Sequence, residues 1–275
     1  MFDQEMLKEV TAIAHDVGRR VLALPPPARF RTPQELRAIF TGIDAPLQAF
    51  VRSRLGGLRP EAAWVEELEG RVPETGEAWV VDAIDGAVQY LQGLPQWCVS
   101  ITLVRGGAPV LAVLHSPLQE ETYAAVAGGG AMRNAAPVEP STKTDLAVAL
   151  VTTSQPPFWA KTPGDPDRAG RSLGNVLLAA GAVRNFGPTS WQIADVASGR
   201  IDAFWQYGVD DGNLLGASLL AKEAGATVTD LLGMPWRAGA DSILAAAPGL
   251  HRRLLDLLPT DRSPHFPRER PHHDA

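Results

Sequence analysis

Two aspartates three positions apart, Asp82 and Asp85, are the residues of this sequence whose spacing most clearly indicates chemistry. They follow an apolar Trp-Val-Val run at 79–81, and Gly86 comes directly after them. Buried carboxylates are costly unless a positive charge neutralises them. Carboxylate oxygens with a backbone carbonyl between them suit a hard cation such as Mg²⁺. A turn at Gly86 that opens a helix would add free N–H groups where a phosphate can bind. The local sequence predicts a site for a metal and a phosphate.

A structural interpretation of the same residues stays open, with Asp82 ending a strand and Asp85 capping a helix. The wider sequence favours the metal site. Residues 79–86 resemble the signature W-[IV]-[IV]-D-P-[IL]-D-G-T of the inositol monophosphatase family of Mg²⁺-dependent phosphatases. Residues 118–134 resemble the hairpin of that family, and residues 199–225 resemble its C-terminal signature. Three such segments in the same order are more specific than one motif.

The resemblance implies a set of ligands for two Mg²⁺ ions. Glu66, Asp82, the Ile84 carbonyl and Asp85 would hold the first ion, and Asp82 and Asp85 would share the second with Asn213. It also implies that water oriented by Glu66 attacks phosphorus, so Glu66, Asp82 and Asp85 are predicted to be catalytic. Glu66 lies in an acidic stretch, and the alternative interpretation is that this stretch is solvated. If Glu66 is not the ligand, Glu67 is the alternative candidate.

Asp44 matches an aspartate near an additional metal site of the family. The opposite interpretation is equally open, because an aspartate followed closely by a proline, here Pro46, is a good helix start. Asp44 is therefore predicted either to bind metal or to be an N-cap.

The resemblance also implies a substrate-binding set. Backbone N–H groups near Gly86 and Ala87 would hold the phosphate, and the predicted substrate residues beyond them are Arg184, Gly187, Thr189 and Gln206. Gln206 replaces a glutamate that meets inositol hydroxyls in some members, which argues against myo-inositol phosphate as the substrate. Helix capping is the alternative role for the residues of the 187–190 loop.

Two departures from the family pattern bear on catalysis. Ala87 stands where the family has a threonine whose hydroxyl helps to position the attacking water, and alanine cannot make those hydrogen bonds. Asn213 aligns with the family's aspartate that binds the second metal ion. Its amide offers a carbonyl oxygen but no negative charge. Asp210 or Asp211 could compensate, although both suit caps of the helix that follows.

Three functional hypotheses follow. The first is Mg²⁺-dependent hydrolysis of a small phosphate monoester at a degenerate site. The second is a pseudoenzyme that binds a phosphorylated ligand or a protein partner, and the third is a repurposed biosynthetic enzyme that uses the same pocket. The sequence contains no G-x-S-x-G elbow, P-loop or H-E-x-x-H motif that would favour another catalytic class.

Composition narrows the class of protein. With 45% hydrophobic and 20% charged residues, a globular protein with ample core is expected. A net charge of -6 gives no reason to expect nucleic acid as an obligate partner. Cys98 is the only cysteine, which excludes a disulfide within the chain and a cysteine zinc cluster. No signal peptide or membrane span is recognisable, so a cytoplasmic location is expected. The resemblance implies a homodimer and a small phosphorylated metabolite as partner.

The hydrophobic periodicity predicts an antiparallel sheet first and alternating strands and helices later. The resemblance implies an α/β fold with an α+β N-terminal half, arranged as a layered α-β-α-β-α sandwich. Subdomains are predicted at 1–140 and 141–258, with a disordered tail at 259–275. His15 and His115 fall in helix and strand patterns and are predicted to be structural.

The hydrophobic pattern also predicts the individual elements. The expected helices are 2–24, 36–55 (interrupted at Gly42 and Pro46), 170–180, 190–198 and 213–224. The expected strands are 97–104, 109–115, 147–152, 201–206 and 243–247, with a second hairpin at 121–134.

Overall fold

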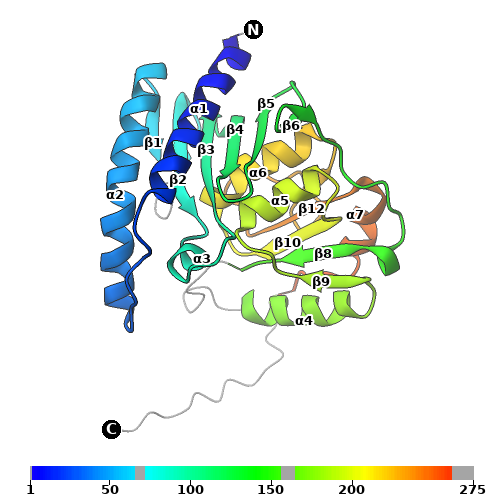
Figure 1. Cartoon of the computed structure of the whole chain (residues 1–275). Helices are drawn as coiled ribbons and strands as arrows, with labels where there is room; N and C mark the ends of the chain where they lie inside the picture. Colours follow the sequence, from blue (N-terminus) through cyan, green and yellow to red (C-terminus); the bar gives the residue numbers. More distant parts are fainter. Residues whose placement is uncertain (1, 66–71, 156–164, 262–275) are drawn as a thin grey trace.

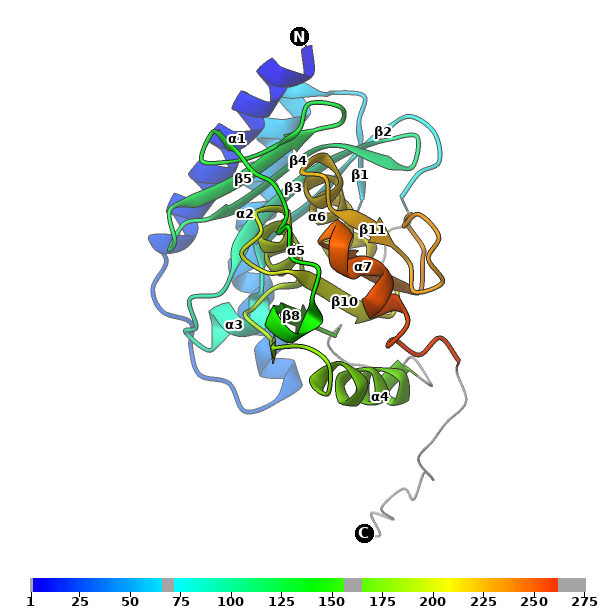
Figure 2. The same cartoon turned by 90° about the vertical axis from the view of Figure 1, so that its right-hand side faces the viewer.

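The computed structural model describes residues 2–65, 72–155 and 165–261 and shows five alternating layers of helix and sheet (Figure 1). Helices α1 (Phe2–Leu22) and α2 (Pro33–Leu58) form one outer layer on the larger sheet. Helices α5 (Thr189–Ala197) and α6 (Asp211–Glu223) lie between the two sheets (Figure 2). Helices α4 (Asp165–Leu177) and α7 (Pro248–Leu255) cover the far face of the smaller sheet. The predicted layered α-β-α-β-α class is confirmed.

The larger sheet contains seven strands in sequence order. Its strands are β1 (Ala63–Val65), β2 (Glu77–Asp85), β3 (Cys98–Arg105), β4 (Ala108–Ser116), β5 (Glu121–Val126), β6 (Ala131–Arg133) and β7 (Ala136–Pro137). Only the β1–β2 pair is parallel; the others are antiparallel. Both predicted hairpins are present, and a short helix α3 (Ala87–Leu91) follows β2.

The smaller sheet has the order β11-β12-β10-β8-β9. Its strands are β8 (Leu150–Thr153), β9 (Ala182–Arg184), β10 (Ala203–Tyr207), β11 (Thr227–Thr229) and β12 (Ser242–Ala246). Strand β8 is parallel to β9 and β10, whereas β12 is antiparallel to β10 and β11. Helix α4 lies between β8 and β9 in the sequence, and α5 lies between β9 and β10, as is usual for crossovers between parallel strands.

Helix α6 joins the two halves because it packs closely on the larger sheet. A Cβ atom on Gly216 would lie 2.3 Å from Thr102 Oγ1, so only glycine allows this approach. At the end of the same helix, the Glu223 carboxylate accepts the N–H groups of Gly128 and Gly130, at 2.8 and 2.9 Å. The second and third segments that carry the family resemblance, 118–134 and 199–225, therefore bind each other in the folded chain.

The predicted interruption of the second helix is wrong, because α2 continues through Gly42 and Pro46. A proline ring inside a helix crowds the carbonyl four residues earlier and removes one hydrogen bond. Here that carbonyl belongs to Gly42, and both residues are exposed, so water can satisfy the freed group. The helix begins instead at Thr32, whose side chain accepts the Glu35 N–H at 3.2 Å. The N-cap interpretation of Asp44 is therefore also wrong.

Other differences concern short elements and boundaries. The strand expected at 147–152 begins at Leu150, after a 3₁₀ turn at Leu146–Val148, and the helix expected at 170–180 is α4, which starts earlier. Strands of three residues, such as β1, β9 and β11, were not predicted because they are too short to show a period. The tail predicted to be disordered begins at residue 259, and the Pro259 carbonyl accepts a hydrogen bond from the Tyr207 hydroxyl at 3.0 Å. The rest of the predicted tail, after residue 261, lies outside the described residues. The subdomain division near residue 140 stays a prediction.

The described residues include no helix that is both long and apolar enough to cross a bilayer.

His15 and His115 form a structural pair on the outer face of the larger sheet. Their ring centroids lie 4.3 Å apart, and both rings bond to the Thr122 hydroxyl, at 2.9 and 3.0 Å. Burial, reinforced by His15, lowers the pKa of His115 to about 4. The folded state therefore holds this imidazole neutral, while the unfolded chain binds a proton below its ordinary pKa near 6.5.

We expect stability to fall as the pH drops from 6.5 towards 4 through His115. Between pH 7 and pH 5 this group alone should lower the free energy of unfolding by about 2 kcal/mol. His115→Gln should remove that part of the slope in urea unfolding at the two pH values. Asp85 and Asp210 have raised pKa values and act in the opposite direction, but they are present in both proteins and cancel in the comparison. Equal slopes would contradict the assignment.

Candidate functional site

A β-bulge at the end of β2 places Asp82 and Asp85 on the same face of the larger sheet. Asp82 pairs with Ser100 of β3, and Asp85 pairs with Cys98, so three steps on one strand oppose two on the other. Side chains three apart in a regular strand point to opposite faces, and the extra residue corrects this. The Asp82 carboxylate accepts the N–H of Ile84 within the bulge at 2.8 Å. Because of the bulge, the three-residue spacing of the motif places both carboxylates on one face of the sheet.

Both carboxylates are buried, with Asp82 7% and Asp85 4% exposed. Asp85 accepts hydrogen bonds from the Ser190 hydroxyl and from the Cys98 thiol, the latter at 3.7 Å. Burial, with a contribution from the Asp210 carboxylate, raises the pKa of Asp85 to about 7. The groups that lower this pKa are neutral hydrogen-bond donors rather than cations. A buried acid in such surroundings favours either a proton or a bound cation.

The turn after Asp85 is fixed by glycine and lies against the 187–190 loop. Gly86 has φ of 96°, and a Cβ there would lie 2.8 Å from the Gln96 carbonyl oxygen. Gly187 packs on the other side of the same residue, since its Cβ would lie 2.4 Å from Gln96 Cβ. Gln96 therefore joins two loops that the sequence separates by a hundred residues. Ala87, the first residue of α3, is half-buried beside them.

A chain of hydrogen bonds connects four polar side chains near Asp85. Thr189 Oγ1 donates to Gln206 Oε1 at 3.0 Å, and Gln206 Nε2 donates to Asp210 Oδ2 at 2.8 Å. Asn213 Nδ2 donates to the other oxygen of Asp210, also at 2.8 Å. Gln206 is fully buried and uses both ends of its amide within the chain. The predicted substrate residue Gln206 thus contacts other protein groups.

Hydrogen bonds connect the predicted residues Thr189, Gln206 and Asn213, whereas the bonds between Asp44 and Gln48 and between Arg184 and Val183 are local. Asp44 lies within α2, where its carboxylate accepts Gln48 Nε2 at 3.4 Å. Arg184 is exposed at the end of β9 and donates to the Val183 carbonyl at 2.7 Å. Glu66 and its reserve Glu67 lie outside the described residues, so their predicted roles stay predictions.

Cys98 was not predicted at this site, Ser190 was predicted only as part of the 187–190 loop, and Asp210 only as a residue that could compensate for Asn213. The sequence did contain a signal for Asp210, since it lies three residues before Asn213, but helix capping was the more obvious role. In the structure its side chain makes no cap hydrogen bond to α6. Cys98 carries no motif, and only its strand pairing with Asp85 reveals it. The bond from Ser190 to Asp85 depends on the packing of α5 against β2.

The donor atoms fit a hard divalent cation in kind. They are carboxylate oxygens with the backbone carbonyl of Ile84 nearby, and no thiolate is available because burial raises the pKa of Cys98 well above its usual range. Within the described ranges, no three His, Cys, Asp or Glu side chains form a compact ligand group. The expected ligand set also includes Glu66, which lies outside the described residues, the Ile84 carbonyl and the Asn213 amide.

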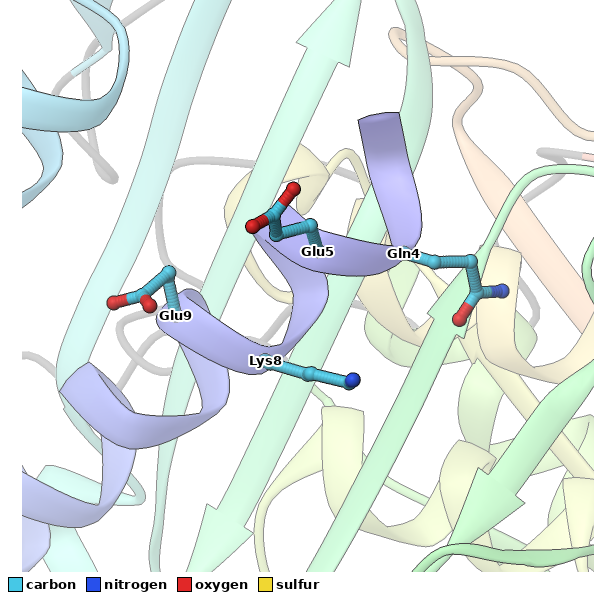
Figure 3. Close-up of a pocket in the computed structure, with 4 residues that line it drawn as sticks. All are labelled: Gln4, Glu5, Lys8 and Glu9. Carbon is cyan, nitrogen blue, oxygen red and sulfur yellow. The ribbon is translucent and has the colours of Figure 1, made fainter. Parts of the chain in front are cut away.

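A surface depression lies on the first turns of α1, away from the candidate site (Figure 3). Its lining residues are Gln4, Glu5, Lys8 and Glu9. Lys8 and Glu9 point in opposite directions from this one helix, so the side chains do not converge on a common point. Asp82 and Asp85 are not part of it, and it offers no comparable chemistry.

Comparison with known proteins agrees with the class indicated by the layered fold and the carboxylate pair. An inositol monophosphatase structure from Anabaena (Nostoc) sp. PCC 7120 superposes with a TM-score of 0.80 at 25% identity, covering 94% of this chain and 98% of that one. The inositol monophosphatase family model matches residues 6–263, so the chain belongs to this family.

Individual relatives carry two different names. The chain is 29% identical to an inositol-1-monophosphatase of Mesorhizobium japonicum over 77% of its own length and 79% of the relative. It is also 29% identical to the Nus factor SuhB of Pseudomonas aeruginosa, over 82% and 83% of the two chains.

Gly86→Ala should destabilise the fold more than Gly93→Ala. Both glycines have positive φ, at 96° and 72°, but a Cβ at Gly93 meets nothing within 4 Å. The control should therefore cost only about 1–2 kcal/mol of left-handed strain, whereas Gly86→Ala adds the clash with Gln96. Urea unfolding of both variants measures the difference. Equal losses would show that the close approach at Gly86 is unimportant.

Proposed function

We propose that this protein is a Mg²⁺-dependent phosphatase that hydrolyses a small phosphate monoester. The observation that carries the proposal is the bulge that places Asp82 and Asp85 together on one buried face, where neutral groups donate hydrogen bonds to Asp85. Family membership supports the same reaction class. Glu66, Asp82, the Ile84 carbonyl, Asp85 and Asn213 would hold the metal.

In this proposal the residues of the chain position the reactants. Glu66 orients and deprotonates the water, and backbone N–H groups of the Gly86–Ala87 turn hold phosphate oxygens. Bound Mg²⁺ would neutralise the phosphate and stabilise the charge that develops on the leaving oxygen. Ser190 and Cys98 fix the direction of the Asp85 carboxylate through their hydrogen bonds.

The buried position of Gln206 bears on the substrate. A glutamate here meets inositol hydroxyls in some family members, but Gln206 is closed off by Thr189 and Asp210. Recognition of the organic part of the substrate must come from other residues, with Thr189, Gly187 and the exposed Arg184 as the proposed candidates. We therefore propose a small phosphorylated metabolite other than myo-inositol phosphate, and a homodimer as the working form.

A pseudoenzyme that binds a phosphorylated ligand or a protein is the second candidate. Ala87 favours it, because the methyl group at the start of α3 cannot bind water. Of the hydroxyl groups near Asp85, that of Ser190 already donates to the carboxylate. A relative named as a Nus factor is consistent with a protein partner.

The phosphatase proposal predicts release of inorganic phosphate from at least one member of a panel of sugar, inositol and nucleotide monophosphates with Mg²⁺. Asp85→Asn should lower kcat at least about 100-fold, because a metal ligand loses its charge. The matched control is Asp256→Asn at the exposed end of α7, which should leave kcat unchanged. Absence of phosphate release across the panel, or equal loss in both variants, would contradict the proposal.

Ala87→Thr separates the two candidates. In a phosphatase limited by the missing hydroxyl, it should raise kcat about tenfold, the equivalent of one hydrogen bond of about 1.4 kcal/mol in the transition state. Ala87→Val has nearly the same shape without the hydroxyl and should give no gain. No gain with threonine in an otherwise active protein would show that water is positioned by another group.

A further inference from the structure

The loop between α1 and α2 exposes a continuous run of apolar residues. Residues 22–28 have the sequence Leu-Ala-Leu-Pro-Pro-Pro-Ala, and all of them are exposed except Pro27, which is half-buried. Leu22 is 49% exposed and Leu24 is 37% exposed. Figure 2 shows the connection between the two helices at the outer edge of the molecule. Apolar residues on a protein surface are normally scattered singly, so a run of this length indicates a surface that contacts a partner.

Four exposed arginines flank this run, two on each side. They are Arg19, Arg20, Arg29 and Arg31. Residues 17–34 contain no acidic residue, whereas the whole chain has a net charge of -6. Asp16 pairs with Arg19 and also with Arg54, so it offsets only part of the positive charge. The loop is therefore a basic region of an acidic protein, and it attracts an anionic surface.

The backbone of the loop is suited to an apolar environment. Ala23 donates its N–H to the Arg19 carbonyl at 3.1 Å. Leu24 donates in the same way to the Val21 carbonyl, also at 3.1 Å. The three prolines at 25–27 have no N–H group at all. Because an N–H without a partner is costly where no water can replace the bond, this part of the loop can enter an apolar medium without that cost.

A second copy of this chain fits the loop poorly. In a two-fold contact each surface meets its own equivalent, so four arginines would face four arginines. Another protein would need a groove shaped to the proline run, with acidic residues on both sides of it. An anionic bilayer provides apolar chains and negative phosphates over its whole surface and needs no such fit. The charge and the shape of the loop therefore favour lipid.

We propose that the α1–α2 loop binds the surface of an anionic lipid bilayer, where Leu22 and Leu24 enter the apolar boundary and the four arginines contact lipid phosphates. Side chains bound in this way lie about 5–10 Å into the boundary between headgroups and acyl chains. Arginine suits this position, because its stem packs on apolar groups while its guanidinium binds phosphate. The contact is peripheral, since no helix of the described residues is long and apolar enough to cross a bilayer. It uses neither Asp82 nor Asp85, so it goes beyond the proposed phosphatase function and stands or falls separately from it.

The test is co-sedimentation of the full chain with vesicles of phosphatidylglycerol or of phosphatidylcholine. The chain should bind phosphatidylglycerol at least about tenfold more tightly than phosphatidylcholine, and about 0.5 M salt should remove most of this preference. Absence of binding to phosphatidylglycerol vesicles at low salt would overturn the proposal.

Two pairs of substitutions separate the apolar part of the contact from a general loss of apolar surface. Leu22→Ser with Leu24→Ser should weaken binding to phosphatidylglycerol vesicles at least about tenfold. The matched control is Leu232→Ser with Met234→Ser in the turn after β11, where the two residues are 74% and 62% exposed. The control should stay within about threefold of the original chain, and thermal unfolding checks that both variants are folded. Equal affinities for the two pairs would overturn the proposal.

A second comparison tests the charges. Arg29→Glu with Arg31→Glu should abolish the preference for phosphatidylglycerol, because the loop then repels the phosphates. Arg252→Glu with Arg253→Glu makes the same change of charge in the last turn of α7 and should leave the affinity within about threefold. If both pairs lower the affinity equally, binding follows the net charge alone and the role of the loop is overturned.

A dye on the loop reports insertion directly. Cys98 is buried, so a thiol-reactive fluorophore labels the cysteine of Leu24→Cys selectively. Its emission should shift to the blue with phosphatidylglycerol vesicles, and the same dye on Leu232→Cys should not shift. Size-exclusion chromatography of the unlabelled chain tests the second copy. A dimer that Leu22→Ser with Leu24→Ser dissociates would assign the loop to a protein contact and overturn the proposal.

Discussion

The one-residue bulge between Asp82 and Asp85 is the constraint on which the candidate site depends. A regular strand would turn one of the two carboxylates into the opposite layer, where it would face the apolar core beneath α1 and α2. The bulge places both on the face shared with Cys98 and Ser100, towards α5 and α6. Gly86 then lets the chain turn against Gln96 without a clash. Two buried acids on one face are unfavourable in isolation, which is the physical reason to expect a cation there.

The second half of the fold completes the site through neutral donors. Ser190 at the start of α5 binds Asp85, and Gln206 at the end of β10 binds Asp210. Because neither donor is charged, they orient the carboxylates without cancelling their charge. Such an arrangement preserves affinity for an added cation, whereas an internal salt bridge would compete with it. The packing of α6 on Thr102, made possible by Gly216, fixes the distance between the two halves.

The departures from the family pattern concern residues that cooperate. Asn213 and Gln206 are both amides where the family has, respectively, an aspartate and in some members a glutamate, and both donate to Asp210. With acids at all three positions, three negative charges would crowd one loop. With two amides instead, one carboxylate, that of Asp210, accepts a hydrogen bond on each of its oxygens. Ala87 has no such compensation among the contacts described, which is why it remains the residue that bears most directly on turnover.

The sequence by itself determined the family, the layered fold class and the aspartate pair, because these depend on local patterns: an apolar strand, a fixed spacing and a glycine turn. The tertiary structure decided what the polar residues do. It buried Gln206 between Thr189 and Asp210, placed Asp44 within a continuous helix, and joined Ser190 to Asp85. The partners of Gln206 lie 17 and 4 residues away, and the Ser190–Asp85 bond joins residues 105 apart, so none of these pairings follows from a short sequence motif. The sequence alone allows a short polar side chain in a loop to cap a helix, bind a ligand or bond to another side chain. Which of these it does depends on the groups that surround it in the folded protein.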